Sequence, residues 1–322
     1  MACESLLKLI LEKAGLSRSI TSPPRLILDL GFGCGDSSLY LTSPGKSSGT
    51  ADFPGRPIAD KYVGLTLDQK QHGLAMKRMQ SARPQAQENS SVVLLCEDAA
   101  RPLTWSANLK SELLRPVQCM VSPPPSPPPV PPAVPRHRRH SRHIVIHHTQ
   151  HPHAALEPVG NAANGSTPEA GDGTQTERWV MALDCLYHFF PSREEIFRYS
   201  NRELGASIMA FDLLLAPDIS KFDWLMLWMI SLFTSAPISN FMVEREYRQQ
   251  LEASGYLADN IVMDDITGDC FKQLAQFLAK REKDLSELGI CSFERFCLAK
   301  MMFRWFATGK VVRAYTVVAR IQ

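Results

Sequence analysis

The sequence predicts an α/β protein built on a doubly wound, mostly parallel sheet with helices on both faces. Apolar runs of strand length alternate along the chain with segments whose apolar residues follow helical periodicity. The strand runs are continuously apolar, which is typical of parallel strands buried on both faces. A glycine-rich turn, LGFGCGD, separates the first of these strands from the helix that follows it.

The predicted elements follow one another in a regular order. An amphipathic helix is expected over 4–14, where charged residues interrupt the apolar ones, unlike the core of a signal peptide. Helices are also expected from Ser37, Asp68 and Ser192. The stretch 216–310 has mainly helical patterns, and we expect a cap over the carboxyl ends of the strands, where such folds bind ligands. Six strands are expected, at residues 25–30, 61–67, 91–98, 178–189, 207–215 and 311–320.

A segment rich in proline and histidine interrupts this pattern at 117–178. It holds 12 of the chain's 23 prolines and seven of its nine histidines. Dense proline favours polyproline II, and the rest has too few large apolar residues to offset the entropy of ordering. We expect a disordered insertion in a surface loop, whose histidines lack the fixed geometry of a metal site. The predicted map is a lead-in (1–23), two halves of one domain (24–116 and 179–322) and this insertion.

Composition narrows the class of protein. The chain has 322 residues and a net charge of +2, from 35 basic and 33 acidic residues, which argues against a dedicated nucleic-acid surface. Its eight cysteines form no C-x-x-C pair, and we interpret them as reduced thiols of a cytoplasmic protein. No stretch reaches the roughly 18–20 apolar residues of a membrane span. The sequence has no metal-binding motif and leaves the oligomeric state open.

The glycine turn raises the question of which nucleotide it would bind. A dinucleotide fingerprint, G-x-G-x-x-G, would place its third glycine at position 36, but the chain has Asp36 there. An aspartate facing a pyrophosphate adds like-charge repulsion, whereas a cationic ligand tolerates it. S-adenosylmethionine has a sulfonium cation and no phosphate. This favours S-adenosylmethionine over a nicotinamide dinucleotide, and hence over an oxidoreductase.

The acid at the end of the first strand and the glycines after it resemble the first motif of class I S-adenosylmethionine-dependent methyltransferases. The residues concerned are Asp29, Gly31, Gly33 and Gly35. The resemblance implies a seven-stranded sheet of the Rossmann-like type, S-adenosyl-L-methionine as the cofactor, and these four residues as part of its binding site.

Two further segments match the family in order. GLTLDQKQ (64–71) resembles the second motif of the cyclopropane-fatty-acid branch, which implies that Thr66, Leu67 and Gln71 line the cofactor. Many relatives have an acid at that strand end for the ribose, and Asp68 lies too late for this, so the ribose partner is open. CEDAARPL (96–103) resembles the third element, where the acid accepts a hydrogen bond from the adenine amine. The candidates there are Asp98 and the backbone of Ala99.

The segments ALDCLYHF and IMAFDLLLAP resemble a branch that methylates small natural products. The resemblance implies that His188 and Asp212 act near the methyl acceptor. Histidine is a natural general base near neutral pH. Our hypothesis is that His188 accepts the acceptor's proton and Asp212 orients or assists it.

The predicted function is methyl transfer to an O, N or C atom of a small apolar or aromatic metabolite, as in secondary metabolism. One alternative is a lipid or sterol carbon as acceptor, because the aromatic helix at 224–233 could line a cap or rest on a membrane surface as well as pack in a core. Another is a non-catalytic interaction protein whose SPPPSPPPVPPAVP segment docks on SH3- or WW-type domains.

Overall fold

The computed structural model describes residues 2–18, 22–43, 56–82, 91–117, 176–234, 236–287, 289 and 294–321. The predicted insertion lies outside the described residues except for its two ends. Its expected disorder and its histidines therefore stay predictions. Its last two residues, Glu177 and Arg178, belong to a strand of the sheet.

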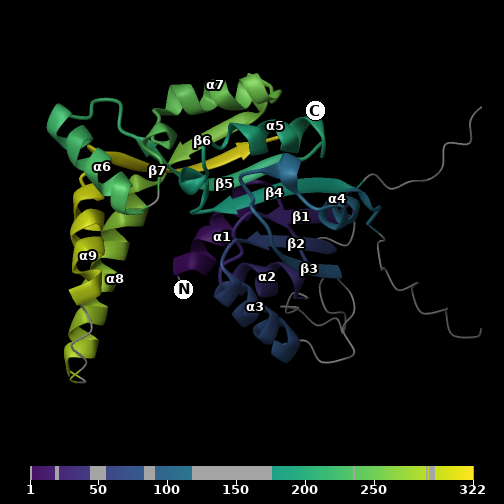
Figure 1. The fold of residues 1–322 in the computed structure, drawn as a ribbon, viewed down its shortest axis with the longest axis horizontal. Helices are drawn as coiled ribbons and strands as arrows, with labels where there is room; N and C mark the ends of the chain where they lie inside the picture. The colour runs from purple at the N-terminus through teal and green to yellow at the C-terminus, as the bar shows by residue number, and fades with distance from the viewer. Residues whose placement is uncertain are drawn as a thin grey trace, which may run out of the picture. The chain divides into compact units, whose positions relative to one another are not determined.

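One seven-stranded sheet organises the described chain (Figure 1). The strands are β1 (Arg25–Asp29), β2 (Lys61–Thr66), β3 (Ser91–Cys96), β4 (Glu177–Leu183), β5 (Ser207–Leu215), β6 (Ile261–Asp265) and β7 (Val312–Ala319). Their order is β3-β2-β1-β4-β5-β7-β6, and only β7 runs antiparallel to its neighbours. The doubly wound, mostly parallel sheet predicted from the sequence is confirmed.

Helices cover both faces of this sheet, as its continuously apolar strands require. The helices are α1 (Ala2–Lys13), α2 (Asp36–Thr42), α3 (Gln69–Ala82), α4 (Ala107–Leu114), α5 (Glu194–Arg202), α6 (Lys221–Thr234), α7 (Glu244–Ser254), α8 (Thr267–Glu287) and α9 (Glu294–Phe306). Leu11 of α1, Leu41 of α2 and Ala75 of α3 belong to the core on one face. Leu109 of α4 and Leu251 of α7 belong to the core on the other. These two cores fix the position of every strand end described below.

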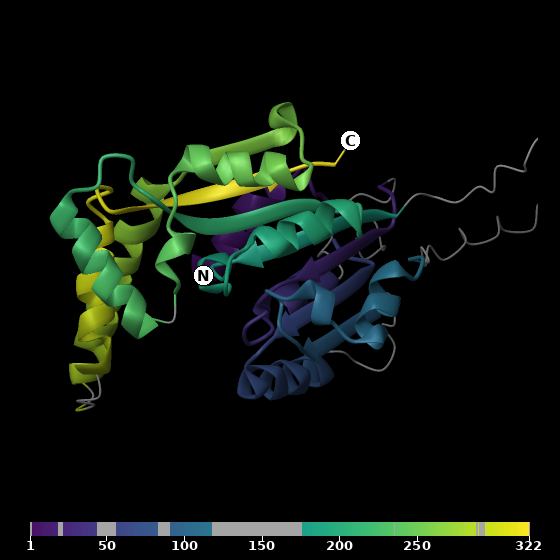
Figure 2. The ribbon, with the colours of Figure 1, turned by 45° about the horizontal axis from the view of Figure 1, so that its top comes forward.

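The stretch 216–310, expected to form a helical cap, does so only in part. Figures 1 and 2 show α6, α8 and α9 gathered beyond the carboxyl ends of β4 and β5, which agrees with the expectation. However, α7 packs beside α5 over a face of the sheet, and Ile261–Asp265 form the edge strand β6. This strand is short, and only Ile261 in it is buried. Periodicity therefore gives such a strand no strong signal.

Candidate active site

The glycine turn follows β1 directly and leads into α2. Gly35 has a φ of +88°, and a Cβ on it would lie 3.0 Å from the Cβ of Ala75 in α3. Gly31 packs against Cys185, whose Cβ would be 3.3 Å from an added Cβ. Gly33 has a φ of +55°, but an added Cβ there would meet no atom of the described residues within 4 Å. Gly31 and Gly35 thus allow close packing, whereas the backbone at Gly33 is open to a ligand.

Asp29 ends β1 at the centre of the sheet, opposite Gly64 of β2 and Met181 of β4. Its carboxylate is buried, and its Oδ2 accepts hydrogen bonds from Tyr62 Oη at 2.6 Å and Ser37 Oγ at 2.9 Å. Its Oδ1 is buried and has no hydrogen-bond partner among the described residues. Burial raises the pKa of Asp29 to about 6, although the bonds from Tyr62 and Ser37 act in the opposite direction. A buried acceptor without a partner is costly, so this oxygen is well suited to a donor on a ligand.

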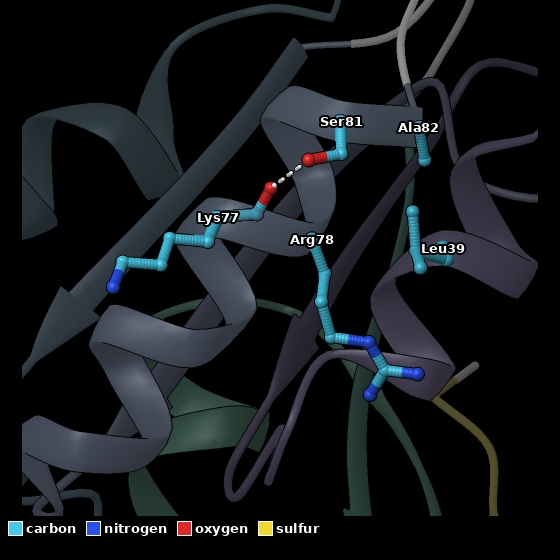
Figure 3. A pocket seen from close by; sticks show the side chains of 5 residues that line it. All are labelled: Leu39, Lys77, Arg78, Ser81 and Ala82. Carbon is cyan, nitrogen blue, oxygen red and sulfur yellow. Dashed lines mark hydrogen bonds between the residues drawn. The ribbon is translucent and has the colours of Figure 1, made fainter.

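Asp36, at the start of α2, forms an ion pair with Arg78 of α3. Its carboxylate is 2.7 Å from Nη2 of Arg78 in α3, and the same guanidinium donates to the carbonyl of Cys34 at 3.0 Å. The repulsion of a pyrophosphate expected from Asp36 is therefore weaker than the sequence suggests. Figure 3 shows Arg78 reaching from α3 toward α2 beside a shallow hollow that also involves Leu39 and Ser81. This hollow contains none of the predicted site residues.

The second predicted segment lies at the carboxyl end of β2. Thr66 Oγ1 donates to Gln71 Oε1 at 3.3 Å and accepts from the backbone N–H of Asp68 at 3.2 Å, which brings two of the expected cofactor residues together. Asp68 Oδ1 accepts from the N–H groups of Lys70 and Gln71, at 2.7 and 3.2 Å. Asp68 thus caps α3, which explains an acid at this position without a ribose. Leu67 is exposed at the same strand end.

The third predicted segment follows β3. Asp98 Oδ1 accepts from the N–H of Ala100 at 2.9 Å, and its backbone carbonyl accepts from the indole of Trp105 at 2.8 Å. These bonds fix the loop that carries Asp98 and the buried Ala99. Because β1, β2 and β3 are neighbours and parallel, the three predicted segments lie along one edge of the sheet.

His188 lies on the same edge, in a short helical turn (Leu186–His188) after β4, and it is exposed. Its ring lies against that of Tyr187, with centroids 4.3 Å apart. The Tyr187 hydroxyl donates to Asp184 Oδ1 at 2.8 Å, and Asp184 adopts a φ of 60°, rare for a residue other than glycine. Neither Asp184 nor Tyr187 was singled out from the sequence. An acid at the end of a central strand, as at Asp29, was the available signal.

Asp212 forms a buried ion pair inside the sheet. It is fully buried in β5, where Arg193 Nη1 donates to its Oδ2 and the N–H of Leu213 donates to its Oδ1 at 2.9 Å. The guanidinium of Arg193 also lies 4.9 Å from the ring centre of Tyr247 in α7. In the described part of the chain no hydrogen bond joins Asp212 to His188. The role of Asp212 near the acceptor stays a prediction, and its observed partner is structural.

A chain of contacts nevertheless connects this ion pair to the turn of His188. Arg193 Nη2 donates to the carbonyl of Asn240. The Asn240 amide in turn donates to the carbonyls of Tyr187 at 3.2 Å and Phe189 at 2.6 Å, which flank His188. The buried pair therefore helps to hold the turn in place. No sequence signal marked Arg193 or Asn240.

Helix α6 exposes an unusually apolar surface beside this edge. Leu227 is buried, and Asp223 accepts from the indole of Trp305 in α9 at 3.0 Å, so one side of α6 packs inward. At 100° per residue the exposed apolar residues span an arc of about 160° in which Lys221 is the one charged residue. Within the described ranges no helix combines the length and apolar character that crossing a bilayer requires. The exposed residues are Phe222, Trp224, Leu225, Trp228, Met229 and Leu232.

Comparison with known proteins establishes the fold. A mycolic acid cyclopropane synthase solved with S-adenosylhomocysteine and CTAB superposes with a TM-score of 0.56 at 11% identity, covering 99% of this chain and 86% of that one. A putative sarcosine dimethylglycine methyltransferase from Galdieria sulphuraria gives a TM-score of 0.54 at 11% identity, covering 98% and 84%.

A third solved structure, geranyl diphosphate C-methyltransferase from Streptomyces coelicolor A3(2) with Mg²⁺, geranyl diphosphate and S-adenosyl-L-homocysteine, gives a TM-score of 0.51 at 11% identity, covering 99% and 77%. No protein-family model matches the sequence, and no curated protein does so significantly. The chain thus has the fold of S-adenosylmethionine-dependent methyltransferases. At this identity the likeness concerns the fold alone.

Proposed function

We propose that the protein transfers a methyl group from S-adenosylmethionine to a small apolar or aromatic acceptor. The observation that carries the proposal is the buried Asp29 carboxylate, which ends β1 beside the glycine turn and has one oxygen that no described residue bonds. Two of the solved structures with this fold contain S-adenosylhomocysteine, the product that the cofactor becomes, which supports the proposal.

The residues at this edge of the sheet fit such a cofactor. The unpartnered Asp29 Oδ1 offers an acceptor to an ammonium or hydroxyl group, and the open backbone at Gly33 allows close approach. The glycine turn would hold the cofactor together with the ends of β2 and β3. The residues that we assign to its binding are Asp29, Gly31, Gly33, Gly35, Thr66, Leu67, Gln71, Asp98 and Ala99.

The chain's own contribution to catalysis would be to position the acceptor and to remove its proton. The bound cofactor supplies a methyl group on a sulfonium leaving group. His188 is exposed at the same edge, so its imidazole can accept a proton from an oxygen or nitrogen of the acceptor. Tyr187 and the turn around it fix the direction of that ring, because Asp184 and Asn240 hold Tyr187 from two sides. Asp212 would assist His188 through Arg193 and Asn240, whose contacts hold the turn.

The exposed face of α6 favours an apolar acceptor. Aromatic and long aliphatic side chains beside the site suit a ligand of the same character. The same observation favours the second candidate, a lipid or sterol carbon presented at a membrane surface, since tryptophan and phenylalanine suit that interface. The intact arrangement around Asp29 argues against a non-catalytic interaction protein.

The test is the transfer of a tritiated methyl group from labelled S-adenosylmethionine to a panel of phenols, apolar amines, sterols and phospholipid vesicles. We expect label in a product from at least one apolar class. With that acceptor, His188→Ala should lower turnover by roughly 100-fold, because a general base contributes about that factor.

Two measurements accompany this variant. S-adenosylhomocysteine should bind to His188→Ala as it does to the wild type, and added imidazole should restore part of the rate. A variant that turns over at the wild-type rate would show that His188 is not the base.

A further inference from the structure

Tyr62 lies between the predicted cofactor site and the core. Its side chain is fully buried in β2, and its hydroxyl donates to Asp29 Oδ2 at 2.6 Å while accepting from Ser38 Oγ in α2 at 2.9 Å. Gly64 leaves room for this ring, because a Cβ there would lie 3.0 Å from Tyr62 Cε1 and 2.7 Å from Phe32 Cδ1. The phenol is therefore fixed by a donor, an acceptor and its packing.

The hydrogen bonds that stabilise the ionised form of Asp29 come from neutral groups. Among the described residues, the titratable groups that face Asp29 are the Tyr62 phenol from β2 and the Cys185 thiol from the turn after β4. Burial and the charge of Asp29 raise both of their pKa values well above the ordinary ones, so both stay neutral near pH 7. No lysine or arginine of the described residues makes a hydrogen bond to Asp29. The bonds from Tyr62 and Ser37, with the backbone of Gly31, are what oppose the effect of burial.

We propose that Tyr62 is a positioning residue for the cofactor. Its hydroxyl holds Oδ2 of Asp29 and favours the charged carboxylate, which leaves Oδ1 as an acceptor for the ligand. This inference rests on the proposed function. It assigns to Tyr62 a role beyond filling the core, because phenylalanine would fill the same volume without the bond.

The test is the affinity of Tyr62→Phe for S-adenosylhomocysteine, measured by calorimetry between pH 5 and pH 9. In the wild type we expect a constant dissociation constant above about pH 7 and a rise below about pH 6, where Asp29 takes up a proton. A hydrogen bond to a charged group contributes roughly 1.5–3 kcal/mol, so its loss should move the pH midpoint of binding upward by about 1 unit or more. This loss corresponds to a shift of about 1–2 units, so at pH 7 the variant should bind roughly two- to tenfold more weakly than the wild type, and at pH 9 within about twofold.

Matched variants separate this role from a general defect. Ser37→Ala, which removes the other donor, should move the midpoint in the same direction. Tyr256→Phe should not move it, because the buried Tyr256 hydroxyl bonds the carbonyl of Ala206 at 2.8 Å and not Asp29.

Three outcomes would overturn the inference in distinguishable ways. Tyr62→Phe that binds like the wild type at every pH shows that the hydroxyl has no role in binding. Tyr62→Phe that is weakened equally at every pH shows a packing defect only. If the folded wild-type protein binds no S-adenosylhomocysteine at any pH, the proposed function is wrong and so is the inference that rests on it.

Discussion

Asp29→Asn is expected to stabilise the protein at pH 7.5 while weakening the binding of S-adenosylhomocysteine by at least roughly 30-fold. Burial raises the pKa of Asp29 from 3.8 to about 6. At pH 7.5 the folded protein therefore holds an ionised carboxylate away from water, which lowers its stability. At 1.36 kcal/mol per pH unit, this difference corresponds to about 3 kcal/mol of unfolding free energy. Asparagine has the same shape and no charge, and it should recover part of that amount.

The gain in unfolding free energy from Asp29→Asn should depend on pH. A carboxyl group with a raised pKa in the folded state lowers stability above that pKa, and the cost disappears once the group is protonated in both states. The difference between Asp29→Asn and wild type should thus be nearly full above about pH 6 and should vanish below the unfolded pKa of 3.8. Binding is expected to fail because removing one partner of a buried, hydrogen-bonded charge costs roughly 2–5 kcal/mol.

Urea denaturation and calorimetry of both proteins check these two effects. The control is Asp264→Asn, which removes a partly exposed carboxylate paired with Lys13 and should change stability by less than about 1 kcal/mol. An Asp29→Asn protein that binds S-adenosylhomocysteine like the wild type would contradict the assignment of Asp29.

Arg193→Met is expected to lower the free energy of unfolding by roughly 3–5 kcal/mol at pH 7.5. The Arg193–Asp212 pair is fully buried, and removing the guanidinium leaves an uncompensated carboxylate in the core. The substitution also removes the donor to the carbonyl of Asn240. Methionine keeps the apolar stem of the side chain, so what is lost is the guanidinium with its charge, its hydrogen bonds and its volume.

Two variants in denaturant melts make this prediction specific. Arg198→Met removes an exposed pair with Glu194 on the same helix and should cost less than about 1 kcal/mol. The double variant Arg193→Met with Asp212→Asn should be more stable than Arg193→Met alone, because it has no unpaired carboxylate at position 212. If Arg193→Met costs no more than Arg198→Met, the buried pair does not stabilise the fold as the contacts indicate.

The sequence predicted those features that depend on local pattern. Continuous apolar runs identified six of the seven strands, and the glycine spacing located the turn after β1. The structure brings the ends of β1, β2, β3 and β4 to one edge, because parallel strands place their carboxyl ends together. The three cofactor segments predicted from resemblance lie along that edge.

Features that depend on long-range contacts were not predictable. Asp36 meets Arg78, which is 42 residues away. Asp212 meets Arg193, which lies at the start of the helix predicted from Ser192 and precedes two glutamates. Nothing local shows that Arg193 is fully buried, because its burial depends on α7 and on the segment that carries Asn240. Tyr62 gave the signal of an ordinary strand residue, and only its hydrogen bond distinguishes it.

The measurement that tests the central claim most directly is the thermal stability of the wild-type protein with S-adenosylhomocysteine and, separately, with NAD. A ligand at about 100 times its dissociation constant adds roughly 2.7 kcal/mol to the unfolding free energy, which should raise the midpoint by a few degrees. We predict this rise with S-adenosylhomocysteine and none with NAD. A rise with NAD alone, or with neither ligand in a cooperatively folded protein, would contradict the proposed methyltransferase.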